Sequence, residues 1–291
     1  MDLAVPQVMI KFTRSDNRTF AFDDDPFGVT SLSGVDGPRL EVFTEKQAVG
    51  DGDIVTGKRV ASRTITITAS NRRIALNKQM RKLASAFFNP LYTYSVEITY
   101  QGSTRSAHDC ELKAIAIPTG NIYKRLEITL TMLSPTGYLD GGGMYGRDIN
   151  SVQPRLGWPW VSVAGVGHLY SLYNFSKAVT VDNDGDGPTF IRAEFIATGS
   201  DQVVNPKLIK GEHFIRVLTA LNPGDVLEIN TEKKQVKING VSVLNLVDKA
   251  SNWTGMQMNV GQNSFGFDAD EHDNQLSVRI YYTKRYYGMG G

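Results

Sequence analysis

Two stretches decide the fold class of this chain, RTITIT at residues 63–68 and LEITLTM at residues 126–132. In both, isoleucine or leucine alternates with threonine or glutamate, and this period of two places the two kinds of side chain on opposite faces of a strand. Residues 94–100 and 276–282 alternate in the same way. Threonine, valine, isoleucine and tyrosine are the residues that strands favour. The sequence therefore predicts a mainly β protein.

A three-stranded meander is predicted in the second half of the chain. The apolar residues of the stretch 226–229 lead into the polar turn 230–234, and Val236 and Ile238 return. Asn239-Gly240 follows at once, and this dipeptide forms tight two-residue turns because both residues tolerate positive φ. The next strand is therefore expected to begin at Val241.

One helix is expected among the strands, over residues 77–88. Its apolar residues recur at the spacing of a single helix face. The residue before a proline is disfavoured in helical conformation, so Asn89-Pro90 ends the helix. The predicted apolar stripe consists of Met80, Leu83, Ala84 and Phe87.

The chain is long enough for two domains. At 291 residues it exceeds the usual size of one domain, about 100–200 residues. Glycine and proline gather between residues 134 and 160 with little periodicity, which is typical of a linker or a long surface loop. We therefore expect a first domain at residues 1–140, a linker at 141–164 and a second domain at 165–291.

A second glycine-rich stretch lies inside the first domain. Strand-like residues 40–44 and 60–68 flank it, so it is interpreted as the tip of a long hairpin. Such a ribbon is well suited to reach a neighbouring subunit. The candidate oligomer-interface residues are Gly50, Asp51, Gly52, Asp53 and Gly57.

Composition excludes several classes of protein. Lysine and arginine total 31 against 30 acidic residues, a net charge of +1, whereas proteins that grip phosphate backbones carry a basic excess or a basic face. The one cysteine, Cys110, allows no internal disulfide and is expected to be a buried thiol. The first residues do not resemble a signal peptide, and no apolar run reaches the ~20 residues that span a bilayer.

No catalytic or cofactor motif is recognisable. The histidines are scattered, and the sequence has neither a Gly-x-Ser-x-Gly elbow nor a phosphate-binding loop that ends in Gly-Lys-Ser/Thr. We therefore expect a protein that is not an enzyme and binds no cofactor. A hydrolase is the least favoured alternative.

The stretch DNDGDG, residues 182–187, matches the first half of a calcium loop. The twelfth position is Ala193, where a bidentate glutamate is needed, and Pro188 begins a strand where a helix should follow. An acidic turn is therefore the better interpretation. The side chains that remain as weak metal candidates are Asp182, Asp184 and Asp186.

Aromatic residues offer one further kind of site. Tyrosines and basic residues gather at 281–287, where packing between domains or subunits is favoured over stacking on a ligand. Trp253 stands in a loop before a late strand. It is a candidate for stacking on a glycan, with core packing as the alternative.

The order of these features resembles the distal tail protein (Dit) family of long-tailed bacteriophages. The motifs that carry the resemblance are residues 183–188, residues 222–225, the stretch LEINTEKKQVKING at 227–240, residues 260–263 and RTITI at 63–67. Val260 departs from the family, which commonly has proline there. The resemblance implies an N-terminal split β-barrel-like domain with one helix and a C-terminal galectin-like β-sandwich.

The family also implies a function. Its members are hexameric rings at the distal end of the phage tail, assembled in the host cytoplasm, and DNA passes through the lumen. The implied partners are identical copies, the tail tube protein, a tail-associated or tail-fibre hub protein and a receptor-binding protein, with no membrane and no specific nucleic-acid contact. Two alternatives stay open: a carbohydrate-binding module for host-surface glycan, and another tail-tube or tail-tip protein on the same barrel.

Overall fold

The computed structural model describes residues 8–23, 25–47, 50–119, 124–149, 151–154, 171–174 and 177–290. The chain divides into two compact units. The first contains residues 1–142 together with 285–291, and the second contains residues 143–284. The last residues of the chain therefore return to the first unit. Among the described residues, the helices are too short or too polar to cross a membrane.

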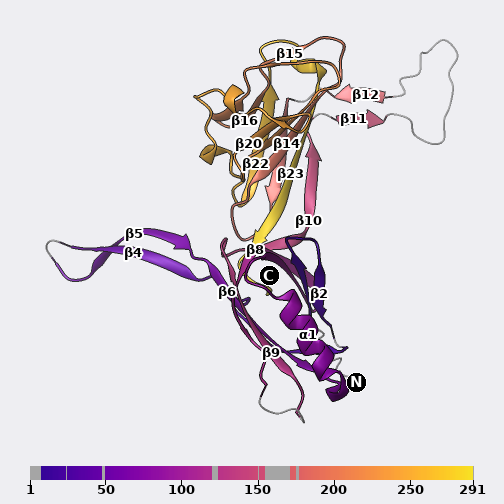
Figure 1. Cartoon of the computed structure of the whole chain (residues 1–291). Coiled ribbons are helices and arrows are strands. Elements are labelled where there is room, and N and C mark those ends of the chain that lie inside the picture. The colour runs from indigo at the N-terminus through magenta and orange to yellow at the C-terminus, as the bar shows by residue number, and fades with distance from the viewer. Residues whose placement is uncertain are drawn as a thin grey trace, which may run out of the picture. The chain divides into compact units, whose positions relative to one another are not determined.

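The first unit is built on antiparallel strands with one α-helix among its described residues, in agreement with the predicted fold class (Figure 1). Its sheet has the order β2-β1-β7-β8-β9-β6-β3. The described end strands β2 and β3 form no ladder with each other, so the sheet does not close into a barrel. The elements are β1 (Val8–Arg14), β2 (Thr19–Phe22), β3 (Phe27–Ser33), β4 (Leu40–Lys46), β5 (Asp53–Val60), β6 (Arg63–Asn71), η1 (Ile74–Leu76), α1 (Asn77–Phe87), β7 (Thr93–Tyr100), β8 (Ser103–Ala116) and β9 (Glu127–Ser134).

The alternation read from the sequence corresponds to the two faces of this sheet. In β6 the residues Ile65 and Ile67 are fully buried, whereas Thr66 between them is half-buried. β9 pairs with β6 in register, so that Ile67 lies opposite Leu130, which is also buried. Burial of such side chains contributes about 1.5–3 kcal/mol each, and a slip of one residue would expose the whole set.

Helix α1 packs on this core, and its buried apolar stripe is narrower than the one that the sequence predicts. Met80, Ala84 and Phe87 are buried, but Leu83 is 47% exposed. The prediction for Leu83 was wrong because helical spacing defines a broad apolar face, and only the sheet determines how much of that face is covered. The helix ends at Phe87, one residue before the predicted end and just ahead of the Asn89-Pro90 pair.

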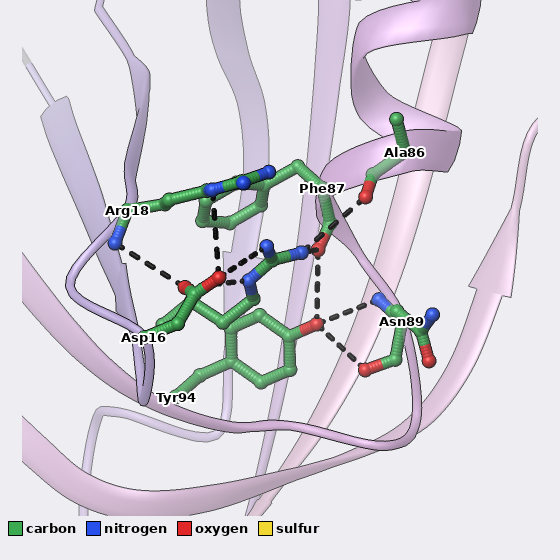
Figure 2. A network of polar contacts seen from close by, with 7 residues as sticks. Asp16, Arg18, Ala86, Phe87, Asn89 and Tyr94 are labelled. Atoms are coloured by element: carbon green, nitrogen blue, oxygen red, sulfur yellow. Dashed lines mark hydrogen bonds and ion pairs between the residues drawn. The ribbon is translucent and has the colours of Figure 1, made fainter.

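A polar network closes the C-terminal end of α1 (Figure 2). Arg14 of β1 is buried, and its guanidinium donates to the carbonyls of Ala86 at 3.3 Å and Phe87 at 2.9 Å. These carbonyls have no partner within the helix, and a cation complements the negative end of the helix dipole. Asp16 binds the same guanidinium through both oxygens, at 2.9 and 2.6 Å. This bidentate pair lowers the pKa of Asp16 to about 2.

Arg63 ties the end of the chain to the first unit. Its guanidinium donates to the carbonyls of Gly34 at 2.9 Å, Gly137 at 3.1 Å and Tyr287. The amide of Met289 donates to Val35 O at 2.9 Å, and the Met289 side chain belongs to the hydrophobic core. These contacts make residues 285–290 a structural part of the first unit.

The second unit is a two-layered β structure. One layer contains β23-β14-β19-β20-β21 and the other β13-β22-β16-β17. Phe195 and Ile280 of the first layer share one buried cluster with Phe265 and Leu208 of the second, which is the arrangement of a β-sandwich. The galectin-like topology stays a prediction. The elements are β13 (Ala178–Asn183), β14 (Ile191–Ala197), β15 (Val203–Val204), β16 (Lys207–Lys210), β17 (His213–Arg216), β18 (Ala220–Leu221), β19 (Val226–Asn230), β20 (Gln235–Ile238), β21 (Val241–Ser242), η2 (Leu244–Leu246), η3 (Thr254–Met256), β22 (Gly261–Asp268), η4 (Asp273–Gln275) and β23 (Leu276–Tyr286).

The predicted meander is confirmed. Strands β19, β20 and β21 pair in sequence order, and Ile238 lies opposite Val241 across the tight turn. Asn239 and Gly240 have φ of 49° and 82°. Both values lie in the left-handed region that asparagine and glycine tolerate best.

The glycine-rich stretch that was expected to begin a linker at residue 141 is a strand in its first part. β10 (Leu139–Asp148) includes Gly141 to Gly143 and Gly146, and β11 (Ser151–Pro154) pairs with β12 (Ser171–Asn174). Gly141 pairs with Arg105 of β8, so partner strands supply the hydrogen bonds that the local sequence does not suggest. Residues 155–164 of the expected linker lie outside the described residues.

Candidate interaction surfaces

The β4–β5 hairpin carries the candidate oligomer-interface residues. Figure 1 shows it running out from the first unit as a two-stranded ribbon. Among the described residues, β4 and β5 pair only with each other. The ribbon therefore keeps two open edges, and a lone two-stranded hairpin is only marginally stable in water.

The structure corrects the extent of the hairpin tip. Asp53 begins β5, and Gly57 lies within it opposite Phe43, so only Gly50, Asp51 and Gly52 of the candidate set belong to the turn. Gly50 and Gly52 have φ of 115° and 93°, values that favour glycine. Of the strand-like residues 60–68, Val60 ends β5 opposite Leu40 of β4, whereas the residues from Arg63 onward belong to β6, which pairs with β3 and β9.

Sequence reasoning missed the apolar side chains on the ribbon. Five of them are about half exposed: Leu40 (56%), Val42 (50%), Phe43 (47%), Ile54 (53%) and Val55 (53%). They lie on both faces of the hairpin, since Val42 and Phe43 are neighbours in one strand. Exposed apolar clusters on a projecting element are typical of interaction sites. The sequence contains one indication of this surface: in the predicted hairpin, apolar residues occur among the side chains of both strand faces.

An ion pair and a ring contact give the ribbon some order. Arg59 pairs with Glu41 across the strands at 2.6 Å and lies 5.5 Å from the centre of the Phe43 ring. The hydroxyl of Thr56 donates to Phe43 O at 3.3 Å, beside the bulge between Phe43 and Thr44. These contacts hold Phe43 at the surface.

The acidic turn is organised by an asparagine. Asn183 is fully buried. Its side-chain nitrogen donates to the carbonyls of Gly187 at 3.1 Å and Asn259 at 3.3 Å. Its side-chain oxygen accepts from the main-chain amide of Gly185 at 3.2 Å. These hydrogen bonds from one side chain hold the loop together, whereas a calcium loop is held together by the cation that its oxygens bind.

Asp182 lies in β13, just before the turn that holds Asp184 and Asp186, and all three side chains are exposed. Asp184 pairs with Lys284 at 2.6 Å, and this contact lowers the pKa of its carboxyl group. Within the described ranges, no three His, Cys, Asp or Glu side chains are grouped to hold a metal ion. The structure therefore does not bring Asp182, Asp184 and Asp186 together.

The aromatic candidates make contacts within their own units. Trp253 is half-buried and packs against the core of the second unit, so part of its ring is already covered; its glycan role stays a prediction. Tyr282 stacks on Tyr145 with centroids 5.5 Å apart. Arg105 lies 3.7 Å from the centre of the Tyr286 ring.

Part of the chain matches a known protein family. Residues 184–286 match the family described as "Siphovirus-type tail component, C-terminal domain". These residues cover most of the second unit, from the acidic turn to the end of β23. No curated protein matches the sequence.

The fold is that of Dit over nearly the whole chain. The crystal structure of SPP1 Dit (gp 19.1), described as a paradigm of hub adsorption apparatus in phages that infect Gram-positive bacteria, is similar with a TM-score of 0.65 and 14% identity, covering 95% of this chain and 98% of that chain. The phage P2 baseplate in its activated conformation with Ca matches with a TM-score of 0.52 and 10% identity, over 97% and 98% of the two chains. The same baseplate with Sr matches with a TM-score of 0.51 and 11% identity over the same shares. The resemblance to the Dit family is confirmed: part of the chain matches the siphovirus-type tail component model, and nearly the whole chain has a Dit-like fold.

Proposed function

We propose that this chain is the hub at the distal end of a long phage tail. Six copies form a ring that joins the tail tube to the host-recognition apparatus, and DNA passes through the lumen. The observation that carries this proposal is the likeness to SPP1 Dit over 95% of this chain and 98% of that one. Assembly in the host cytoplasm and a place in the virion follow from this role.

The β4–β5 hairpin is the proposed contact between copies. Its open edges offer unpaired main-chain groups, and an added strand would satisfy them. Its half-exposed apolar side chains would be covered in the same step. The turn residues Gly50, Asp51 and Gly52, with Asp53 and Gly57 of β5, lie at or near the end of this ribbon.

The remaining partners are proposed from the same role. The ring would bind the tail tube protein on one side and a tail-fibre hub protein or receptor-binding protein on the other. The net charge of +1 suits a channel that DNA must leave freely, because phosphate binding depends on basic excess. The role is structural and requires no turnover.

The test is the assembly state of the purified chain. Light scattering should give six copies per particle, and negative-stain images should show closed rings. The double variant Val42→Asp, Phe43→Asp should yield monomers, because two carboxylates would be buried in the contact. The control is Leu91→Asp, since Leu91 is 85% exposed on the same unit.

Two results would overturn the proposal. One is a chain that stays monomeric at high concentration and is not captured by co-expressed tail proteins. The other is open filaments in place of rings, which would favour a tail-tube protein.

A further inference from the structure

A polar cavity of about 510 Å³ lies in the second unit. It is formed by the β16–β17 turn, the loop around η3 and the first residues of β22. Ligand sites of proteins usually measure about 300–1,000 Å³. The lining includes Lys210, Glu212, His213, Thr254, Gln262 and Ser264.

Lys210 is the cation of this cavity. It is half-buried, and its ammonium group donates to the main-chain carbonyl of Gln257. Burial lowers the pKa of Lys210. Among the described residues, no carboxylate lies within ion-pair distance of it. A partly desolvated ammonium group without a carboxylate is stabilised by an added anion.

The imidazole of His213 is held in place by two neighbours. A Cβ atom at Gly255 would lie 2.3 Å from the ring, so the ring rests directly on the glycine backbone. The amide nitrogen of Asn252 lies 3.3 Å from His213 Nδ1. Because an amide nitrogen only donates, Nδ1 accepts, and the Nε2–H group is left as a donor.

Asn263 makes the opposite rim rigid. It is 4% exposed, and its amide donates to the carbonyls of Asn259 at 2.7 Å and Gly261 at 2.8 Å. Its oxygen accepts from the amide of Asn259 at 2.9 Å. A rim fixed in this way loses little conformational entropy when a ligand binds.

The chemistry of the lining indicates the ligand. Hydroxyl and amide side chains both donate and accept hydrogen bonds, which matches the hydroxyl groups of a sugar. Glu212 can only accept, so it suits a hydroxyl donor and disfavours a ligand with many negative charges, such as a nucleic acid. Lys210 suits one oxyanion.

We propose that this cavity binds an acidic saccharide. Its single oxyanion, a carboxylate or a phosphate, pairs with Lys210. Its hydroxyl groups bond to His213, Glu212 and the amide and hydroxyl side chains. The site belongs to one copy of the chain and does not depend on ring formation.

The test uses the full chain with three probes: glucuronate, a glucose monophosphate and glucose. Saturation-transfer NMR and calorimetry should detect at least one acidic sugar, with glucose at least tenfold weaker. Lys210→Met should weaken the acidic sugar by about ten- to hundredfold, because a hydrogen bond to a charged group is lost, and should leave glucose unchanged. Lys233→Met, in the exposed β19–β20 turn, is the matched control.

Gly255→Val provides a second variant. Its side chain would displace the His213 ring and should abolish binding while β-sheet circular dichroism is kept. Binding of glucuronate alone would show that the oxyanion is a carboxylate, and binding of the glucose monophosphate alone would show that it is a phosphate. The proposal is overturned if none of the probes binds at millimolar concentration, if glucose binds as tightly, or if Lys210→Met binds like the wild type.

Discussion

Replacement of Arg63 by methionine should release the end of the chain from the first unit. Methionine keeps the length and the apolar stem of the side chain but removes every donor. The carbonyls of Gly34, Gly137 and Tyr287 would then lose their charged partner at a site that is 4% exposed.

The expected size follows from these contacts. A hydrogen bond from a charged donor contributes about 1.5–3 kcal/mol, so the three bonds have a gross value of about 5–9 kcal/mol. Two effects offset roughly half of this loss. The variant no longer has to bury a guanidinium, a cost that is visible in the lowered pKa of Arg63, and the methionine side chain packs in its place. We expect a net loss of about 3 kcal/mol, which is about a hundredfold in an opening equilibrium.

Hydrogen exchange measures this opening segment by segment. The amide of Met289, bonded to Val35 O at 2.9 Å, should exchange about a hundredfold faster in Arg63→Met. Arg59→Met is the control, since its side chain is 66% exposed and surface pairs contribute about 0–1 kcal/mol. Equal exchange of residues 285–290 in Arg63→Met and wild type would refute the reasoning and assign the attachment to apolar packing alone.

Three further predictions concern single side chains. The pKa of Asp16 is lowered from 3.8 to about 2, so its stabilisation is complete above the unfolded value and is lost as the pH falls through the folded one. Asp16→Asn should therefore unfold more easily than wild type at neutral pH, and in an acid titration the difference should shrink below about pH 4 and vanish only below the folded pKa. Gly240→Val should destabilise the second unit by about 1–2 kcal/mol in denaturant, because φ at Gly240 is 82° and a side chain in the left-handed region costs that much; an unchanged midpoint would contradict it. Burial raises the pKa of Cys110 to about 12, so a thiol reagent should label the unfolded chain and leave the native chain unlabelled at neutral pH.

The candidate sites were less predictable than the strands. The hairpin at residues 40–60 was recognised from its glycines, but the exposure of Val42 and Phe43 depends on whether another strand covers the ribbon, and none of the described strands does. Asp184 was correctly placed in an acidic turn, yet its partner Lys284 is 100 residues away in the chain. The cavity brings together Lys210, Gly255 and Asn263 from three separate elements, and no local pattern marks them.

The sequence by itself determined the mainly β class, the helix predicted at 77–88, the Asn239-Gly240 turn and the resemblance to the Dit family. These features depend on the period of side chains along a strand or helix and on the φ values that a residue tolerates, which are properties of neighbours in the chain. Only the tertiary structure decided that Leu83 is exposed, that Gly141 lies in a strand and that Tyr287 returns to Arg63. Burial and long-range hydrogen bonds depend on which distant segments meet, and alternation along one strand carries no information about its partners.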